Sequence, residues 1–251
     1  MSPSSASVCD NNVSVLSSDS ESDISNIGQL DGNVSVCQPN VRVDKIAAAL
    51  NLPTVATYNL RSLFPKIESL KTDLLERQID VGFLVEIWEQ SHKSDHQFEI
   101  EKMLEMNGLQ YISTARPPNR KGVSYGGAAI VVNLEKFTCE KLKINTPNNL
   151  EVVWGLLKPK CPSAKFKKII ICSFYSPPNK RRNSKMADHI VSTLQMLSSK
   201  YPECGIILGA DKNTMDIRPI LNCGLRLRQV VDKNTRKSEI LDIIIMNLIG
   251  L

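Results

Sequence analysis

The sequence predicts an α/β fold in which two sheets pack face to face and helices cover their outer surfaces. Near the start of the ordered region, the strand-like stretches "PTVATYNL" and "DVGFLVE" flank a segment with apolar residues at helical spacing. Most apolar stretches further along are strand-like as well, and no internal repeat occurs. Strands interspersed with a few helices, without repeats, are typical of layered α/β domains.

The first unit is predicted as strand, helix and strand. "PTVATYNL" is rich in β-branched residues and ends near Asn59, and "DVGFLVE" (80–86) is a second apolar run of strand length. Between them, leucine and isoleucine recur every three or four residues, and Pro65 falls in the first turn, where its missing N–H costs nothing. A β-α-β unit implies that the two strands are parallel neighbours.

The remaining elements follow from the same patterns. "HQFEIEKMLEMNG" predicts a helix with Gly108 as its cap, and an amphipathic segment at about 184–200 predicts a second one. Strands are predicted at 126–133, 150–158, 166–175, 204–210 and 240–247. The stretch "LRQVVD" is expected to be a polar loop.

Residues 1–45 differ from the rest of the chain in composition. They are rich in Ser, Asp and Asn, as in "SVLSSDSESDIS", and have no sustained hydrophobic period. Such a segment buries too little apolar surface to fold, so we expect a disordered tail. Residues 50–251 are expected to form one domain, and with 42% apolar residues the chain can build a sizeable core.

Positive charge is concentrated in the body of the chain. The net charge is +5, yet residues 1–50 carry six acidic residues against Arg42 and Lys45. Between Lys158 and Lys185 there are nine Lys and Arg residues and no acidic residue. This segment indicates either a polyanionic partner, with DNA as the expected one, or an ordinary solvated lysine-rich surface.

The hydrophobic runs, the N-terminal sequence and the cysteines favour an intracellular location, nuclear or cytoplasmic. No run approaches the roughly 18 apolar residues that a membrane span needs. The start "MSPSSASVCDNN" lacks the basic and apolar regions of a signal peptide. The seven cysteines include no CxxC pair, which favours reduced thiols over a structural zinc site.

Several predicted strands end in a polar residue. Asn59, Glu86 and Tyr175 end three of them, and Asp211 and Asn213 follow a fourth. Ligands in α/β proteins bind at the carboxyl ends of strands, so these positions are candidates for a site, although each could be an ordinary turn or cap residue. Glu86 is costly to bury alone. Its partner is either a hard cation such as Mg²⁺ or an Arg or Lys side chain.

Seven motifs occur in the order found in the endonuclease/exonuclease/phosphatase superfamily. They are "TYNLRSL", "FLVEIWEQ", "YGGAAIVVN", "LEVVW", "SFYSPPN", "GADKN" and "SEILDIIIMN". Together they span about residues 52–248. The chain most resembles the apurinic-type endonuclease domain of non-LTR retrotransposons.

The resemblance implies a four-layered α/β sandwich of two mainly antiparallel sheets with outer helices, and phosphodiester cleavage with Mg²⁺ or Mn²⁺. Glu86 would hold the metal, and Asn59 would help to order that end of the site. Asp211 would orient or deprotonate the attacking water. Asn213 and Tyr175 would contact the phosphoryl group, and Asp242 would orient a catalytic histidine.

Two departures from the family pattern affect these expectations. The usual Gly-Asp-x-Asn is here Gly209-Ala210-Asp211-Lys212-Asn213, so the glycine is shifted by one residue. The family's terminal Ser-Asp-His strand does not occur before Leu251, so the last strand or strands of the sandwich are expected to be missing. The three histidines, at positions 92, 96 and 189, are expected to lie on the surface.

Two functions of different class therefore remain open. The chain is either a metal-dependent DNA endonuclease domain of retrotransposon origin, inactive or strongly impaired because it lacks the catalytic histidine, or a non-catalytic nucleic-acid-binding or protein-interaction module. A positioned histidine typically contributes on the order of 10²–10⁴ in rate.

Overall fold

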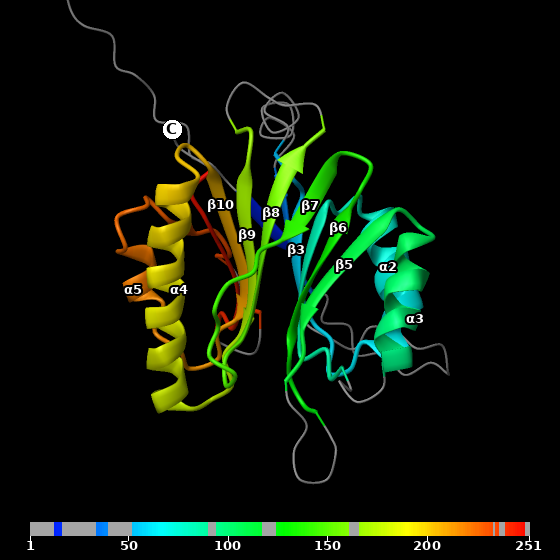
Figure 1. The fold of residues 1–251 in the computed structure, drawn as a ribbon, viewed down its shortest axis with the longest axis horizontal. Coiled ribbons are helices and arrows are strands. Elements are labelled where there is room, and N and C mark those ends of the chain that lie inside the picture. Colours follow the sequence, from blue (N-terminus) through cyan, green and yellow to red (C-terminus); the bar gives the residue numbers. More distant parts are fainter. Residues whose placement is uncertain are drawn as a thin grey trace, which may run out of the picture.

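The computed structural model describes residues 13–16, 34–39, 52–89, 94–116, 124–160, 166–232, 234–235 and 239–248. These residues form two sheets that pack face to face, with helices on both outer surfaces (Figure 1). The predicted four-layered α/β sandwich is therefore confirmed. Among the described helices, none is long and apolar enough to cross a membrane.

The first sheet has the strand order β1-β2-β3-β4-β6-β5. Its strands are β1 (Val13–Leu16), β2 (Val34–Pro39), β3 (Val55–Asn59), β4 (Val81–Val85), β5 (Leu109–Thr114) and β6 (Ala128–Asn133). β3 and β4 are parallel, and the other pairs are antiparallel. A short 3₁₀-helix (Phe64–Lys66) and α2 (Ile67–Glu76) connect β3 to β4, which confirms the β-α-β unit.

The second sheet has the strand order β11-β12-β10-β9-β8-β7. Its strands are β7 (Phe137–Lys141), β8 (Glu151–Pro159), β9 (Ile169–Tyr175), β10 (Gly205–Asp211), β11 (Arg228–Gln229) and β12 (Asp242–Met246). Only β9 and β10 are parallel in this sheet. Helix α4 (Lys180–Lys200) connects these two strands, so each sheet is mainly antiparallel around one parallel pair.

Hydrophobic side chains form three clusters, one between each pair of layers. Between the sheets, Phe83 and Ile130 of the first sheet pack with Ile171, Ile207 and Ile244 of the second. Helices α2 and α3 (Ser94–Glu105) cover the outer face of the first sheet, and α4 and α5 (Arg218–Leu221) cover that of the second (Figure 1). The two sheets are thus held together by a layer of apolar side chains.

Some elements differ from their predicted positions. Strands β5 and β7 were not predicted, and β11 lies within the segment predicted as a polar loop. Helix α4 begins at Lys180 rather than near 184, because the Asn179 side chain accepts a hydrogen bond from the Arg182 backbone N–H (3.1 Å) and caps the helix there.

Two short strands lie within the segment predicted as a tail. β2 pairs with β3, and β1 pairs with β2, so these residues extend the first sheet. Cross-strand pairing satisfies their backbone groups without a hydrophobic core of their own. The disordered tail stays a prediction. The other residues of 1–45 lie outside the described part of the chain, so the domain boundary at about 45–50 stays a prediction.

Candidate phosphoesterase site

Four polar side chains lie in one row across the second sheet. Glu151 is paired in register with Tyr175, Tyr175 with Asp211, and Asp211 with Asp242. Residues that pair directly across strands point to the same face of a sheet. Three of these four residues were predicted as site residues, and the structure brings them together. Glu151 was not predicted.

Asn59 connects this row to the first sheet. Its Nδ2 donates one hydrogen bond to Glu86 Oε1 (3.0 Å) and one to Asp211 Oδ2 (3.0 Å). Asn59 ends β3 and Glu86 follows β4, whereas Asp211 ends β10 in the opposite sheet. The carboxylates of Glu86 and Asp211 therefore lie close together across the junction of the two sheets.

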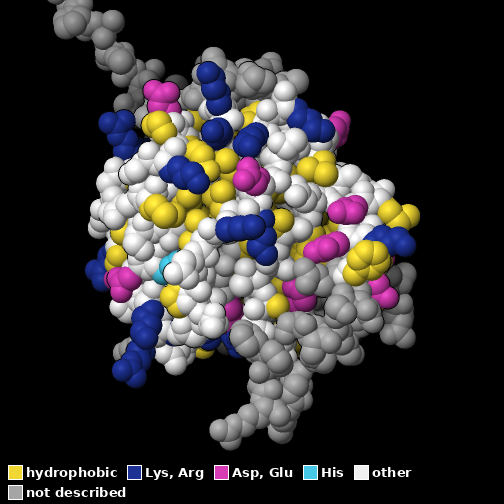
Figure 2. All heavy atoms as spheres, viewed as in Figure 1, with side chains coloured by type: hydrophobic (Ala, Val, Ile, Leu, Met, Phe, Trp, Pro, Cys, Tyr) yellow, Lys and Arg dark blue, Asp and Glu magenta, His cyan; other side chains and the backbone are white. Residues whose placement is uncertain are grey.

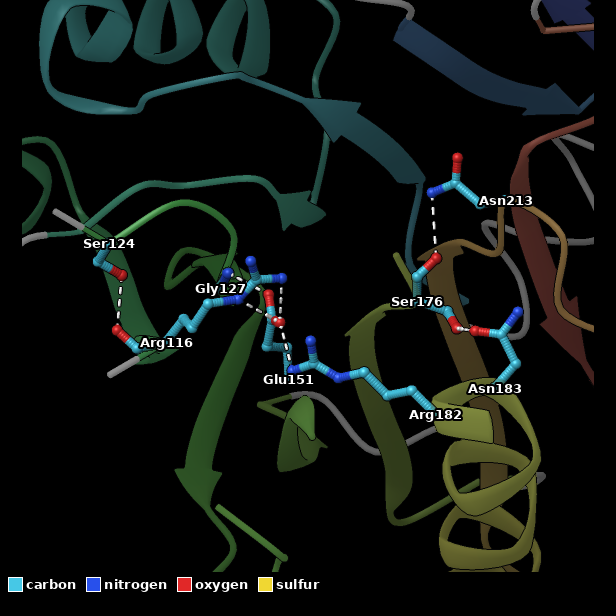
Figure 3. A network of polar contacts seen from close by, with 8 residues as sticks. All are labelled: Arg116, Ser124, Gly127, Glu151, Ser176, Arg182, Asn183 and Asn213. Carbon is cyan, nitrogen blue, oxygen red and sulfur yellow. Dashed lines mark hydrogen bonds and ion pairs between the residues drawn. The ribbon is translucent and has the colours of Figure 1, made fainter. Parts of the chain in front are cut away.

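Asn213 lies on the same side of the junction. Its backbone N–H donates to Asp211 Oδ1 (3.0 Å), and its side-chain Nδ2 donates to the backbone oxygen of Ser176 (3.1 Å). Ser176 also donates its backbone N–H to the Asp211 backbone carbonyl (3.0 Å), and its hydroxyl contacts the Asn183 side chain (2.8 Å; Figure 3). The loops after β9 and β10 thus hold each other, and they fix the Asn213 amide near Asp211.

Unusual backbone conformations gather at the site. Glu86 (φ 53°), Trp88 (φ 49°) and Asn213 (φ 42°) lie in the left-handed region, which asparagine tolerates but which is rare for Glu and Trp. Hydrogen bonds from the Ser62 N–H to the Glu86 backbone carbonyl and from the Leu63 N–H to the Ile87 backbone carbonyl (both 2.9 Å) hold this turn in place. Strain of this kind is typical of functional sites, where it fixes the direction of a side chain.

The donor set fits a hard divalent cation. Asn59 Oδ1 is buried and has no hydrogen-bond partner among the described residues, next to the two carboxylates that Asn59 Nδ2 bridges. In the described part of the chain, no group of three or more His, Cys, Asp and Glu residues could hold a metal. Mg²⁺ does not require such a group, because it commonly takes one or two carboxylates together with water and phosphate oxygens.

Glu86 has no Arg or Lys partner, the alternative to a cation, among the residues that the structure describes. Within the described residues, its carboxylate forms no salt bridge with Arg or Lys, and its hydrogen-bond donor is the Asn59 amide. Glu86 is partly exposed, so the carboxylate keeps access to solvent. This arrangement leaves it available to a cation.

The Tyr175 hydroxyl remains protonated at all ordinary pH values. Burial raises the pKa of this phenol well above its usual value, and the nearby carboxylates of Glu86, Asp211 and Glu151 raise it further. The Arg116 guanidinium opposes this shift and lies 5.9 Å from the centre of the Tyr175 ring. Tyr175 can therefore donate a hydrogen bond to an anion but does not act as a base.

Asp242 lies beside Asp211, and its role in orienting a histidine stays a prediction. It is 2% exposed, and its backbone N–H donates to the Thr235 hydroxyl (3.0 Å). Among the histidines, only the His189 side chain is described. It contacts Thr146 (3.4 Å), and burial lowers its pKa. The side chains of the other two, at positions 92 and 96, lie outside the described residues.

The predicted basic surface is divided between the two ends of the second sheet. Strand β8 runs away from Glu151 toward Lys158 and Lys160, and β9 returns from Lys168 to Tyr175. Arg181 and Arg182 lie instead at the start of α4, just after the site. In Figure 2, basic side chains gather at the upper end of the molecule, and a smaller group lies at the lower left. Only the α4 group is at the same end of the sheet as the site.

Glu151 of the row and two arginines next to it were not predicted as site residues. Glu151 is 1% exposed and forms ion pairs with both Arg116 and Arg182 (Figure 3). The signal for Glu151 is similar to that for Glu86, because each carboxylate stands next to an apolar run of strand length. Glu86 follows "VGFLV", and Glu151 precedes "VVW". For the two arginines the sequence holds no comparable signal, since their partner is distant in the chain.

Glu89, which follows the turn at residues 86–88, is expected to make the free energy of unfolding depend on pH. It is 5% exposed and accepts a hydrogen bond from the Ser113 hydroxyl (2.8 Å). Burial raises its pKa, with a smaller contribution from Glu101, while Ser113 and Lys141 act in the opposite direction. With a folded-state pKa above the ordinary value of about 4.3, Glu89 stabilises the fold fully below that value and loses this contribution as the pH rises through the folded-state pKa.

In Glu89→Gln this ionisation is absent. We expect the free energy of unfolding of the variant to fall less steeply than that of the wild type as the pH rises from about 4. Urea denaturation at several pH values measures it. The exposed Glu140→Gln serves as the control and should follow the wild-type curve; identical slopes for Glu89→Gln and the wild type would show that Glu89 ionises normally.

A two-sheet sandwich with polar strand ends collected at one edge is the fold of endonuclease/exonuclease/phosphatase proteins, and comparison with solved structures shows that this chain has that fold. An endonuclease/exonuclease/phosphatase family protein from Bacteroides thetaiotaomicron matches 78% of this chain over 84% of its own, at 17% identity and a TM-score of 0.57. The mannosyl-6-phosphatase Bt3783 of B. thetaiotaomicron VPI-5482 matches 78% of this chain over 85% of its own (15% identity, TM-score 0.55). The human Nocturnin catalytic domain matches 73% of this chain over 75% of its own (15% identity, TM-score 0.53).

Comparison with protein-family models gives no match, and neither does comparison with curated protein sequences. The similarity is thus one of fold. Because the matching structures include a mannosyl-6-phosphatase, the fold by itself does not define the substrate.

Proposed function

We propose that the chain is a divalent-cation-dependent phosphodiesterase domain that acts on DNA, of the kind found in non-LTR retrotransposons. The observation that carries the proposal is the Asn59 bridge between Glu86 and Asp211, because it sets two carboxylates and an unpaired amide oxygen around one point. The order of the seven sequence motifs supports the retrotransposon origin. The fold similarity does not bear on it.

Each residue would have a distinct role in hydrolysis. Glu86 would hold Mg²⁺ or Mn²⁺ together with Asn59, and the cation would neutralise charge on the phosphate oxygens. Asp211 would orient the attacking water, since its carboxylate lies at the same point and is itself fixed by Asn59 and Asn213. The amide of Asn213 and the protonated hydroxyl of Tyr175 would donate hydrogen bonds to non-bridging oxygens.

A second candidate, a nucleic-acid-binding module without catalysis, is favoured by one observation. His189 is the one histidine among the side chains that the structure describes, and it contacts Thr146 rather than a site residue, so no general acid of that type is in place among them. We therefore expect slow cleavage by these 251 residues, with binding of metal and phosphate as the stronger property.

A supercoiled-plasmid nicking assay with Mg²⁺ or Mn²⁺ tests this function. We expect slow nicking that EDTA abolishes and that Asp211→Asn lowers by on the order of 10²-fold or more, because the variant cannot accept the proton from water. Glu140→Gln, which changes an exposed carboxylate, is the matched control. Equal nicking by the wild type and Asp211→Asn would contradict the site assignment. Cation-dependent DNA binding without nicking would favour the second candidate.

A further inference from the structure

We propose that Arg116 and Arg182, held together by Glu151, form a second phosphate-binding site for a phosphate of the polynucleotide other than the one that is cleaved. This inference rests on the proposed function and extends it, because it distinguishes a polynucleotide substrate from a small phosphate ester. The evidence lies in the hydrogen bonding, the charge and the position of the two guanidinium groups.

The cluster is built into the fold. Glu151 Oε1 accepts hydrogen bonds from Arg116 Nε (2.6 Å) and Arg182 Nη2 (2.8 Å), and Oε2 accepts one from the Gly127 backbone N–H (2.6 Å). The two arginines approach the carboxylate from opposite sides (Figure 3). A Cβ atom at Gly126 would overlap Glu151 Oε2, so the "GG" of "YGGAAIVVN" provides the space that this arrangement needs.

The charges in the cluster do not balance. One buried carboxylate faces two guanidinium groups, which leaves one positive charge uncompensated within the cluster. The other charged groups near Tyr175 are Glu86 and Asp211, which are the carboxylates proposed to face the metal. An uncompensated charge that is largely removed from water favours binding of an anion.

Donors remain free for such an anion. A guanidinium group has five N–H bonds, and Glu151 engages only part of them on each arginine. Arg182 Nε is buried and has no hydrogen-bond partner among the described residues. The side chains of Arg116 and Arg182 are 28% and 21% exposed, so a ligand can reach them. The planar fork of each group matches the geometry of phosphate oxygens.

The position of the cluster selects the kind of substrate. Glu151 and Asp211 are in register with Tyr175 on either side, so they are two strand spacings, roughly 10 Å, apart. Successive nucleotides of one DNA strand rise by about 3.4 Å along the helix axis, so a phosphate about three nucleotides away lies at this distance. A single phosphate bound at the metal cannot reach it. The cluster is thus placed to hold another backbone phosphate of the same polynucleotide.

Binding of a short duplex DNA, measured by fluorescence anisotropy over a range of salt concentrations, tests the proposal in EDTA and in Mg²⁺. For Arg116→Gln and for Arg182→Gln we expect binding to weaken by about 10–100-fold, and the slope of log affinity against log salt to fall by about 1. Lys160→Gln removes the same charge at the opposite end of the sheet and should change both values much less. Equal effects from Lys160→Gln and the arginine variants would overturn the proposal.

Two further measurements separate the explanations. Arg182→Lys keeps the charge, so we expect the salt slope to stay while the affinity falls, and it also serves where the glutamine variants fold poorly. Thymidine monophosphate should bind the wild type and the arginine variants equally in Mg²⁺; a parallel loss would overturn the idea of a second site. The salt dependence of DNA binding is measured in EDTA, where no cation is bound, so it tests the arginines independently of the metal site. If Glu86→Gln left Mg²⁺ binding unchanged, the proposed metal site would be wrong, but the result for the arginines would still stand.

Discussion

In Glu86→Gln, the thermal stabilisation that Mn²⁺ or Mg²⁺ gives to the wild-type chain is expected to be lost. The glutamine keeps the shape of the side chain and can still accept the hydrogen bond from Asn59 Nδ2, but it has no charge to hold the cation. A ligand at about 100 times its dissociation constant stabilises the native state by about 2.7 kcal/mol. For a domain of this size that is a shift of about 5–10 °C in the melting temperature.

A cation titration followed by thermal denaturation measures this shift, with EDTA as the reference. Asp211→Asn provides an internal comparison: if Asp211 acts on the attacking water and Glu86 on the metal, Asp211→Asn keeps most of the shift that Glu86→Gln loses. Glu140→Gln should behave as the wild type. A full shift in a well-folded Glu86→Gln variant would mean that the cation is bound elsewhere or not by this carboxylate.

Gly209→Ala is expected to destabilise the fold by about 1–3 kcal/mol. A Cβ atom at this position would overlap the ring of Phe83, which is fully buried in the opposing sheet. The ring can move only if the two sheets separate, because other core side chains surround it. Urea denaturation of the variant measures the loss as a change in the free energy of unfolding.

A second glycine provides the matched control. At Gly82, a Cβ atom would meet Leu74 Cδ2 at 3.2 Å, at the flexible end of a side chain, so Gly82→Ala should cost less than Gly209→Ala. Phe83→Leu added to Gly209→Ala should recover part of the lost stability. If the two glycine variants are equally stable, close approach of the sheets at Gly209 is not important.

Gly209 also accounts for the shifted glycine in "GADKN". Residues 209 and 211 point to the same face of β10, toward the first sheet, where Phe83 leaves room only for glycine. Ala210 points to the other face and packs in the cluster beneath α4. Close packing against Phe83 of the first sheet therefore requires glycine at position 209. Asp211 still lies at the end of β10.

Much of the fold and part of the site could be predicted from local patterns. Buried strands such as β4 and β10 are continuous apolar runs, and their polar ends mark Glu86 and Asp211 without knowledge of the partner strands. Strands β5 and β7 were missed for a physical reason. β5 follows α3 directly, with only a short turn at Gly108, and β7 is a half-exposed edge strand with little apolar signal.

The arginine cluster could not be predicted because no local pattern encodes it. Arg116 follows β5 and Arg182 lies in the first turn of α4, and only the packing of both sheets brings them to Glu151. In the sequence, Arg182 is one of nine basic residues between Lys158 and Lys185. The structure separates those of them that it describes into two groups at opposite ends of the second sheet, which adjacency in the chain does not reveal.

The Asn59 bridge has a consequence for how the protein is made. Its two hydrogen bonds join residues that are 27 and 152 positions apart, so the site depends on contacts of very different range. Contacts of long range form late in folding, because the chain must first close a large loop. On the ribosome, a growing chain acquires the Glu86 half early but gains Asp211 only when synthesis has passed β10. A cation could therefore bind between Glu86 and Asp211 only after both sheets have assembled.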